Sequence, residues 1–562
     1  MLAALGILVY FGFRNYYFDD PFITYRVSEN LANGLGFLYN PGERIAATTS
    51  PLWTLLLAGL HFFTRTPLPL LGPALSILLL VIAAELLARA LTLSFRGAAA
   101  GGAADPSRSS QLPTLASIFM VINPHFAMTA GMETMLVFTL ALAAILAYQH
   151  ERLTWAALFA SLAILARMDA ALVALILALH FLFTRRQLFP LRAVIAFLVP
   201  LALWFGFSLL YFHELLPSTL AVKIAQRQSA GHWGAGFIFL QQLGQILQKD
   251  FFTRDPLNLL LLALLGLGLG GIIRSRSFAG LVILAWAAGH ALAYGLILNV
   301  PAYDWYFAPI FLLLTLALAA GTVSLVSGRA WVLRGGGVLT LAILLFWAGA
   351  WFGFDSQIID KILTPVHLSH FFFYLAMLAL GPLSFSRLAG RRAFRTYALV
   401  LVAVAAMVPR NWNGWLQVET FPPTQFRNYR LAAEWINTNL PGARSVGADE
   451  IGILGYYLPD RVIVDQCGIP TPGAAEHLAR GDYTWWIERY RPEALVLHPA
   501  RDWWWRVEGP IKEAAWFERA YRRRVTLEAD RTGPPWGKHA VEVWAKIEDA
   551  QIPAVGDLDN SR

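Results

Sequence analysis

Apolar runs long enough to cross a membrane recur along most of this chain, and they constrain its fold more than any other feature. A helix needs roughly 20 apolar residues to cross the hydrocarbon core of a bilayer. The chain is 57% hydrophobic and only 14% charged, whereas soluble domains carry about 25% charged residues. The sequence therefore predicts a polytopic α-helical membrane protein.

We predict about 13 membrane-spanning segments. They lie near residues 1–14, 69–95, 112–130, 134–149, 153–167, 170–184, 189–212, 256–273, 278–298, 307–326, 337–354, 368–384 and 396–409. The apolar segment 50–64 is shorter, so we expect it to lie along the membrane interface. The basic runs then gather in alternate loops, which become cytoplasmic by the positive-inside rule. This predicts a multi-pass plasma (inner) membrane protein with a cytoplasmic N-terminus.

The C-terminal residues 410–562 have the composition of a soluble domain outside the cytoplasm. YRLAAEWINTNLPG predicts an amphipathic helix that ends at Pro-Gly. RVIVD, ALVLHP, VTLEAD and HAVEVWAKI predict short strands. We therefore expect a transmembrane domain, 1–409, and an α/β domain, 410–562. Cys467 is the one cysteine, which excludes an intramolecular disulfide and a cysteine-based zinc site.

Two adjacent aspartates, Asp19 and Asp20, follow the first apolar segment directly. Carboxylates beside a membrane cost free energy and are often functional. Asp20 precedes Pro21, and Asp followed by Pro is a common helix start, so helix capping is an alternative role for Asp20. Nothing in the sequence gives Asp19 a comparable structural role, so Asp19 is the stronger candidate for a catalytic residue.

Other charged residues lie in loops predicted to share this side of the membrane. Glu133 is either an acid at a helix N-terminus or a site carboxylate. Arg167 and Asp169 form a local ion pair or contact a substrate. Lys223 and Arg227 lie one helical turn apart and bind either lipid headgroups or a phosphate.

Two further groups have a structural and a functional interpretation. Arg26 and Glu29 lie three residues apart on a predicted helix, so they either pair with each other or one binds a ligand. NVPAYDWYFAP suits an interfacial aromatic belt and equally a surface on which a sugar stacks. Its polar and aromatic side chains are Tyr303, Asp304, Trp305 and Tyr306. The sequence contains no P-loop, HExxH or GxSxG motif.

The stretch FDDPFITYRVSENLANGLGFLYNPGERIAATTSPLWT is similar to the first outer loop of polyprenyl-phosphate-sugar-dependent glycosyltransferases of the GT-C fold. It most resembles the mycobacterial terminal β-arabinofuranosyltransferase type, with its pattern DD-x-x-I-x-x-R, NL-x-x-G-x-G, N-x-GER and TS-x-x-W-T. The matching residues are Asp19, Asp20, Ile23, Arg26, Asn30, Leu31, Gly34, Gly36, Asn40, Gly42, Glu43, Arg44, Thr49, Ser50, Trp53 and Thr54. Weaker similarity extends to AGMET, ARMDA, LPSTLAVK, YDWYF and DEIGILGYYLPDRVIVDQCGI.

This resemblance implies a GT-C domain with an outward-facing cavity, a polyprenyl-phosphate sugar donor and a hydroxyl of a cell-envelope glycan as acceptor. Asp19 or Asp20 would be the general base. The donor phosphate and the substrates would contact Arg26, Lys223, Arg227, Glu133, Arg167, Asp169, Tyr303, Asp304 and Tyr306. The first loop, 15–50, would be structured by Asn40, Glu43, Arg44 and Trp53.

No resident cofactor is expected from this resemblance. A divalent metal at Asp20 is the alternative, because the string DP-x-x-x-x-R is similar to one in oligosaccharyltransferases in which the aspartate binds a metal. The sugar stays open between arabinofuranose and the donors of protein O-mannosyltransferases or lipid A aminoarabinose transferases.

Other classes of protein remain as alternatives. A transporter or flippase for lipid-linked sugars would explain the many spans, although transporters favour charges at mid-membrane and internal repeats. A membrane-anchored glycan-binding assembly factor would use the 410–562 domain alone. The net charge of +8 does not indicate a nucleic-acid partner, because the basic residues follow the loops.

Overall fold

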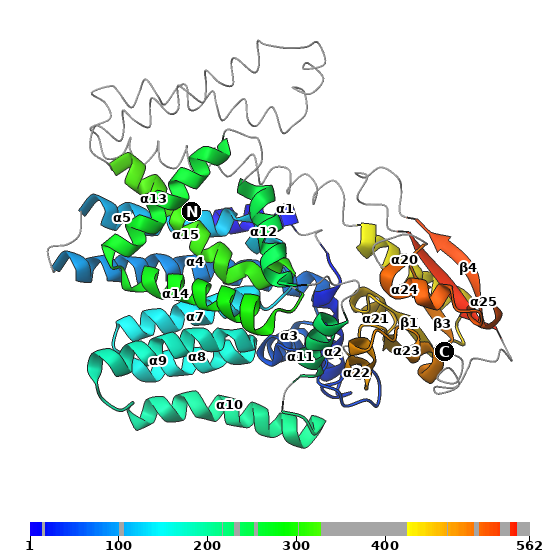
Figure 1. Cartoon of the computed structure of the whole chain (residues 1–562). Helices are drawn as coiled ribbons and strands as arrows, with labels where there is room; N and C mark the ends of the chain where they lie inside the picture. The colour runs from blue at the N-terminus through cyan, green and yellow to red at the C-terminus, as the bar shows by residue number, and fades with distance from the viewer. Residues whose placement is uncertain are drawn as a thin grey trace, which may run out of the picture.

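The computed structural model describes residues 1–13, 17–100, 106–215, 217–229, 236–251, 257–301, 303–327, 424–468, 470–499, 505–528 and 540–547. A bundle of long helices lies beside an α/β domain, and the two meet at one end of the bundle (Figure 1). Five helices are apolar and long enough to cross a membrane, namely Leu68–Phe95, Met168–Arg185, Leu191–Phe212, Phe278–Leu298 and Trp305–Ser324. The described part of the chain is thus that of a multi-pass membrane protein.

The apolar bundle is built from helices that follow the predicted segments closely. They are α1 (Leu2–Phe13), α4 (Leu68–Ala100), α5 (Pro106–Ile122), α7 (Thr134–Gln149), α8 (Leu153–Ala166), α9 (Ala171–Arg185), α10 (Leu191–Phe212), α13 (Leu257–Ser275), α14 (Phe278–Leu292) and α15 (Ala308–Ser327). The last three predicted segments, 337–354, 368–384 and 396–409, lie outside the described residues. The predicted segment 112–130 is too long, because Asn123 and Pro124 end α5 and begin the short helix α6 (Pro124–Ala127).

Shorter elements connect these helices. They are α2 (Asp20–Ala32), α3 (Pro51–Thr64), η1 (Met168–Ala170), α11 (Ser218–Gln228), α12 (Ile238–Phe251), η2 (Ala293–Leu298) and η3 (Asp304–Phe307). The segment that we expected at the interface, 50–64, forms α3. Figure 1 shows α2, α3 and α11 together at the end of the bundle that faces the α/β domain.

Glycines allow α13 and α15 to pack closely. A Cβ atom on Gly321 would lie 1.9 Å from the carbonyl oxygen of Leu264, and one on Gly268 would lie 1.8 Å from that of Ala317. Small residues at helix contacts are a common way for membrane helices to approach each other. Larger side chains at these two positions would push the helices apart.

The α/β domain contains one mixed sheet with the strand order β2-β1-β3-β5-β4. Its strands are β1 (Ser445–Ala448), β2 (Val462–Asp465), β3 (Ala494–Leu497), β4 (Tyr521–Leu527) and β5 (Val541–Lys546). β1 pairs in parallel with β2 and β3, whereas β5 pairs antiparallel with β3 and β4. The four predicted strands are present, and the short β1, SVGA, was not predicted.

Six helices accompany the sheet in the described part of the domain. They are α20 (Thr424–Asn439), α21 (Gly452–Tyr457), α22 (Ala474–Ala479), α23 (Trp485–Tyr490), α24 (Trp505–Lys512) and α25 (Phe517–Ala520). The predicted helix YRLAAEWINTNLPG corresponds to α20. Val222 and Ala225 of α11 join the apolar cluster of this domain, beside Leu478 of α22. This contact helps to hold the domain against the bundle.

The segment 17–50, which we call the first segment, joins the bundle to the α/β domain through buried hydrogen bonds. Asn40 accepts from the N–H of Ile463 and donates to its carbonyl oxygen, both at 2.9 Å, so that it extends the edge of β2. The Tyr39 hydroxyl donates to the carbonyl oxygen of Ile451 at 2.7 Å. These bonds fix the domain over the end of the bundle.

Candidate active site

A cavity of about 880 Å³ lies where the first segment, the bundle and the α/β domain meet. Charged and polar side chains from all three parts line it, and aromatic side chains accompany them. The charged and imidazole groups are Asp19, Asp20, Glu133, Arg167, Asp169, Lys223, Asp449, Glu450, Asp465 and His498, and the aromatic ones are Phe18, Tyr294, Tyr303, Trp305 and Tyr306. The tertiary structure thus brings most of the predicted site residues into one cavity.

Asp19 is buried at the start of α2 and binds the α/β domain. Its Oδ2 accepts a hydrogen bond from the backbone N–H of Gly452 at 2.6 Å, and its Oδ1 accepts one from Ile453 at 2.7 Å. These N–H groups belong to the first turn of α21. Burial raises the pKa of Asp19 to about 6, while the two backbone hydrogen bonds act in the opposite direction. Asp19 therefore has a structural role that its sequence position did not reveal.

Asp20 lies partly exposed in the cavity near Lys223. The helix α2 begins at Asp20, one residue before the start at Pro21 that was predicted, so Asp19 occupies the cap position, without a side-chain capping bond. The expectation that Asp20 caps α2 is therefore wrong. Burial raises the pKa of Asp20, and the positive charge of Lys223 opposes this shift. Burial likewise lowers the pKa of Lys223, against the influence of Asp20. The carboxyl group of Asp20 and the amino group of Lys223 thus lie near each other in the cavity.

The ammonium group of Lys223 lies over an aromatic ring at one end of a stack. Its Nζ lies 4.3 Å from the ring centroid of Tyr303. Tyr303 stacks on Trp305, with centroids 4.9 Å apart and planes 6° from parallel. Phe18 stacks on Trp305 in turn, at 5.5 Å. The predicted aromatic segment therefore forms a stack inside the cavity, beside the lysine.

Glu133, Arg167 and Asp169 form a buried ionic group on the bundle side. Arg167 Nε donates to Asp169 Oδ1 at 2.9 Å, and Nη1 lies 3.9 Å from Glu133 Oε1. His290 Nδ1 lies 3.7 Å from Asp169 Oδ2, and its Nε2 is 2.7 Å from the carbonyl oxygen of Tyr306. Among the described residues, Arg167 Nη1 and Nη2 have no hydrogen-bond acceptor. The predicted local ion pair is present, and two donor nitrogens remain at the cavity wall.

Two predicted ligand residues with described side chains, Arg26 and Arg227, are not in the cavity lining. Arg26 is buried, and its three donor nitrogens bind backbone carbonyl oxygens instead of a phosphate or Glu29. Arg227 is exposed and donates to the carbonyl oxygen of Leu298 at 3.2 Å. It is therefore separated from Lys223, although the two share a helix. Asp304 begins η3, and its side chain lies outside the described residues.

The residues expected to structure the loop make specific contacts. Asn40 Nδ2 donates to Glu43 Oε2 at 3.0 Å in addition to binding β2. The guanidinium of Arg44 lies over the ring of Tyr211 at 4.9 Å. Trp53 is fully buried, and its Nε1 donates to the carbonyl oxygen of Gly131 at 3.0 Å.

The sequence analysis missed the contribution of the α/β domain to the cavity. Asp449, Glu450, Asp465 and Cys467 lie within the string DEIGILGYYLPDRVIVDQCGI, which was noted only for its similarity. His498 follows β3, and no motif around it in the sequence indicated a functional role. Burial, and next the charge of Asp19, raise the pKa of Glu450 well above its ordinary value.

Two groups of side chains in the described part of the chain have the composition of a metal site. Asp19, Asp20 and Glu450 bring carboxylate oxygens within 4.8 Å of one another. In the α/β domain, Asp449, His498 and Glu508 bring two carboxylate oxygens and one imidazole nitrogen within 4.8 Å of one another. The first group contains Asp20, the residue considered as a metal ligand from the sequence.

The fold and the cavity define the class, which is a multi-pass membrane protein of the GT-C fold with an α/β domain closing one end of the site. The structure is similar to that of ArnT from Cupriavidus metallidurans bound to undecaprenyl phosphate, with a TM-score of 0.57 and 15% identity over 98% of each chain. It is also similar to the apo state of ArnT from the same organism, with a TM-score of 0.52 and 15% identity over 96% of this chain and 97% of that one. The expected GT-C fold is thereby confirmed.

Sequence comparison adds little to this structural likeness. A family model described as a domain of unknown function (DUF8728) matches residues 420–544, which form most of the α/β domain. No curated protein matches the chain. None of these findings singles out the terminal β-arabinofuranosyltransferases.

Proposed function

We propose that this chain is a membrane glycosyltransferase that moves a sugar from a polyprenyl-phosphate donor to a hydroxyl group of an acceptor glycan. The carrying observation is the cavity in which Asp20 and Lys223 lie together. The fold supports the donor class, because the similar ArnT was solved with undecaprenyl phosphate. The cavity would open outside the cytoplasm, where lipid-linked donors and envelope glycans meet.

Asp20 is our candidate for the general base. Both oxygens of Asp19 already accept short hydrogen bonds from the backbone of α21, so their lone pairs are less available to an acceptor hydroxyl. Asp20 would take the proton of that hydroxyl as its oxygen attacks the anomeric carbon. The bond from the anomeric carbon to the phosphate oxygen breaks, and the polyprenyl phosphate leaves with the electron pair. Such proton transfer contributes on the order of 100- to 10,000-fold in rate.

Lys223 would stabilise the leaving phosphate. Its partly buried ammonium group lies beside the Tyr303 ring at 4.3 Å, where little water competes for the charge. The stack of Tyr303, Trp305 and Phe18 offers a flat apolar surface for a sugar face or the first isoprene units. Arg167 lines the same cavity, and its Nη1 and Nη2, which have no hydrogen-bond acceptor among the described residues, would bind sugar or acceptor oxygens.

The charge of the cavity favours a donor sugar that carries an amine. Seven carboxyl groups line the cavity, together with two basic side chains, Lys223 and Arg167. The ammonium group of a cationic sugar would favour the ionised form of these carboxyl groups and pair with them, whereas neutral arabinofuranose carries no charge for such a pairing. We therefore place an aminoarabinosyl donor before an arabinofuranosyl one.

The test uses the purified full chain in lipid nanodiscs with polyprenyl-phosphate arabinofuranose, aminoarabinose and mannose, and with glycan and lipid A acceptors. We expect turnover with at least one donor. Asp20→Asn should lower kcat at least 100-fold. Glu29→Gln is the matched control, because Glu29 lies on the same helix outside the cavity lining and should retain activity.

The phosphate contact has its own matched pair of variants. Lys223→Ala should weaken binding of the lipid-phosphate donor about 10-fold or more, as expected for a charged hydrogen bond. Arg227→Ala should leave donor binding unchanged, because Arg227 lies outside the cavity. Full activity of Asp20→Asn would overturn the base assignment. Donor movement across the bilayer without turnover would favour a flippase, and glycan binding by the domain without turnover would favour an assembly factor.

A further inference from the structure

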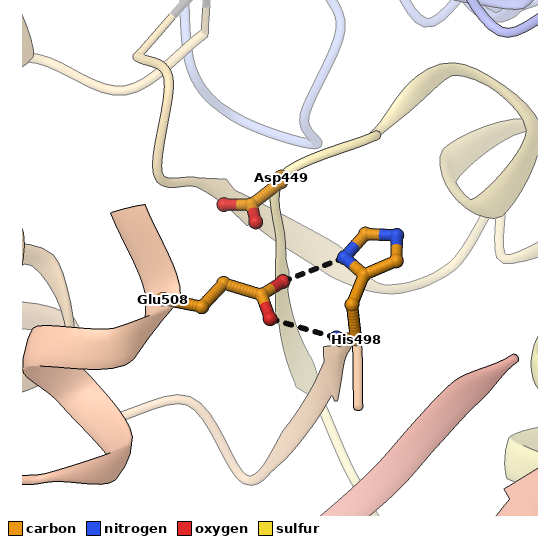
Figure 2. Close-up of side chains that lie close together, drawn as sticks. All are labelled: Asp449, His498 and Glu508. Carbon is orange, nitrogen blue, oxygen red and sulfur yellow. Dashed lines mark hydrogen bonds and ion pairs between the residues drawn. The ribbon is translucent and has the colours of Figure 1, made fainter. Parts of the chain in front are cut away.

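The ends of two parallel strands and one helix bring three ionisable side chains together in the α/β domain. Asp449 follows β1 directly and His498 follows β3 directly, and the two strands are neighbours in register. Glu508 lies on α24. Figure 2 shows the three side chains converging. The carboxyl ends of adjacent parallel strands are a common place for a ligand site.

His498 is held firmly in one orientation. Its Nδ1 lies 2.7 Å from Glu508 Oε1, and its backbone N–H donates to Glu508 Oε2 at 2.8 Å. Its Nε2 lies 2.8 Å from the hydroxyl of Tyr429, which is fully buried. A histidine whose outer nitrogen is held by a neighbouring group is the usual arrangement behind a metal-binding imidazole.

Asp449 is the unexplained member of the group. It is only 5% exposed, and its carboxyl group shares a side-chain hydrogen bond with the carboxyl group of Glu508. Its nearest ionisable neighbours include Glu508, a second acid. Burial, and next the charge of Glu508, raise the pKa of Asp449 well above its ordinary value. Two buried carboxyl groups in contact are costly unless a shared proton or a cation compensates their charge.

We propose that Asp449, His498 and Glu508 bind a divalent cation such as Mn²⁺ or Zn²⁺. The donor set of two carboxylates and one imidazole suits these ions. Tyr429 can accept the Nε2 proton, which leaves the Nδ1 lone pair for the metal. The ion would lie between Nδ1 and the two carboxylates and would displace the proton now shared there. The distance between His498 Nδ1 and Glu508 Oε1, now 2.7 Å, would increase by less than about 1 Å, so that metal–ligand bonds of roughly 2.1 Å could form.

The cation would face the cavity of the proposed active site. Asp449 and His498 line that cavity, whereas Glu508 lies behind them. Coordination positions that the protein leaves open would therefore point toward bound ligands. A phosphate or hydroxyl oxygen is the chemical group that such an ion would bind. The binding of the ion itself does not depend on the transferase activity.

The experiment measures Mn²⁺ binding to the full chain after chelation and dialysis, by the electron paramagnetic resonance signal of free Mn²⁺. We expect one strongly bound ion per chain, with modulation from an imidazole nitrogen in the pulsed spectrum and displacement by Zn²⁺. Asp449→Asn should weaken binding at least 10-fold, and His498→Gln should remove the nitrogen modulation. Glu476→Gln removes an exposed carboxylate of the same domain and should change nothing.

Three results would overturn the proposal. Absence of stoichiometric Mn²⁺ or Zn²⁺ binding would mean that Asp449 and Glu508 share a proton instead. Unchanged affinity in Asp449→Asn would place the ion elsewhere, and loss of affinity in Asp20→Asn alone would place it at the first-segment carboxylates. Folding is checked without metal by gel filtration and melting. Asp449→Asn should melt no lower than the chelated wild type, because the Asn amide can donate a hydrogen bond to the Glu508 carboxylate without a shared proton.

Discussion

Replacement of Arg26 by methionine should loosen the contact between the first segment and the α/β domain. Arg26 is 2% exposed, and its guanidinium donates hydrogen bonds of 2.7 Å to the carbonyl oxygens of Tyr39, Gly455 and Arg461. Methionine fills part of the same volume and cannot donate. The three carbonyl oxygens, two of them in the α/β domain, would lose this partner.

The size of the effect follows from these bonds. A hydrogen bond from a charged donor contributes about 1.5–3 kcal/mol, and a buried acceptor left alone costs about 1–3 kcal/mol. Bonds made by one group are not additive, so we expect a total loss of about 3–6 kcal/mol. At roughly 2–4 °C per kcal/mol, the melting temperature of the α/β domain should fall by about 6–24 °C.

The assay combines tryptophan fluorescence during heating with limited proteolysis of the purified chain. Cleavage between the bundle and the α/β domain should be faster in Arg26→Met. Arg44→Met is the control, because Arg44 is exposed on the same segment and contacts the ring of Tyr211, which is worth about 0.5–1 kcal/mol. Melting of Arg26→Met within about 2 °C of wild type, with unchanged proteolysis, would refute the docking role of Arg26.

Three further predictions concern the same junction and the bundle. The pKa of Asp19 is raised from 3.8 to about 6 in the fold, so folding takes up a proton. The free energy of unfolding should therefore fall by about 2–3 kcal/mol as the pH rises from 4 through 6. Asp19→Asn should flatten this part of a profile of melting temperature against pH, and an unchanged slope would contradict the assignment. Gly452→Ala should also weaken docking, since its Cβ would lie 1.9 Å from the carbonyl oxygen of Asp19, and faster proteolysis is the readout. Gly321→Ala should lower the melting temperature of the bundle, because the added Cβ would collide with Leu264. Gly266→Ala is the control and should not lower it, because a Cβ there meets open space. Equal effects of the two variants would argue against close packing of α13 and α15.

Local pattern was sufficient for most of the elements. Each predicted span up to residue 326 corresponds to a helix, because the need to remove apolar side chains from water acts along every segment by itself. The error at 112–130 arose from Pro124, whose missing N–H and capping neighbour Asn123 end α5 early. The short strand β1, SVGA, contains a glycine and a single β-branched residue, whereas the equally short β2 and β3, VIVD and ALVL, contain apolar runs that were recognised.

The roles of individual site residues needed the tertiary structure. Asp19 and Arg26 looked like the reactive acid and the phosphate ligand. Apart from the carbonyl oxygen of Tyr39, however, the hydrogen-bond partners found for them are backbone groups in and after α21, more than 400 positions away. Hydrogen-bond partners at such a separation leave no local pattern. His498 became visible only because β1 and β3 are adjacent in the sheet.

Hydrophobicity and residue type along short stretches were sufficient to predict the membrane-spanning helices and the acids after the first span, whereas the GT-C fold was inferred from the resemblance of residues 18–54 to a known family. Only the folded chain shows which acid binds the backbone of α21, which basic side chains line the cavity and that the α/β domain supplies part of its wall. Those properties depend on distance in space, and the chain sets such distances only after the first segment has docked on β2 and α21.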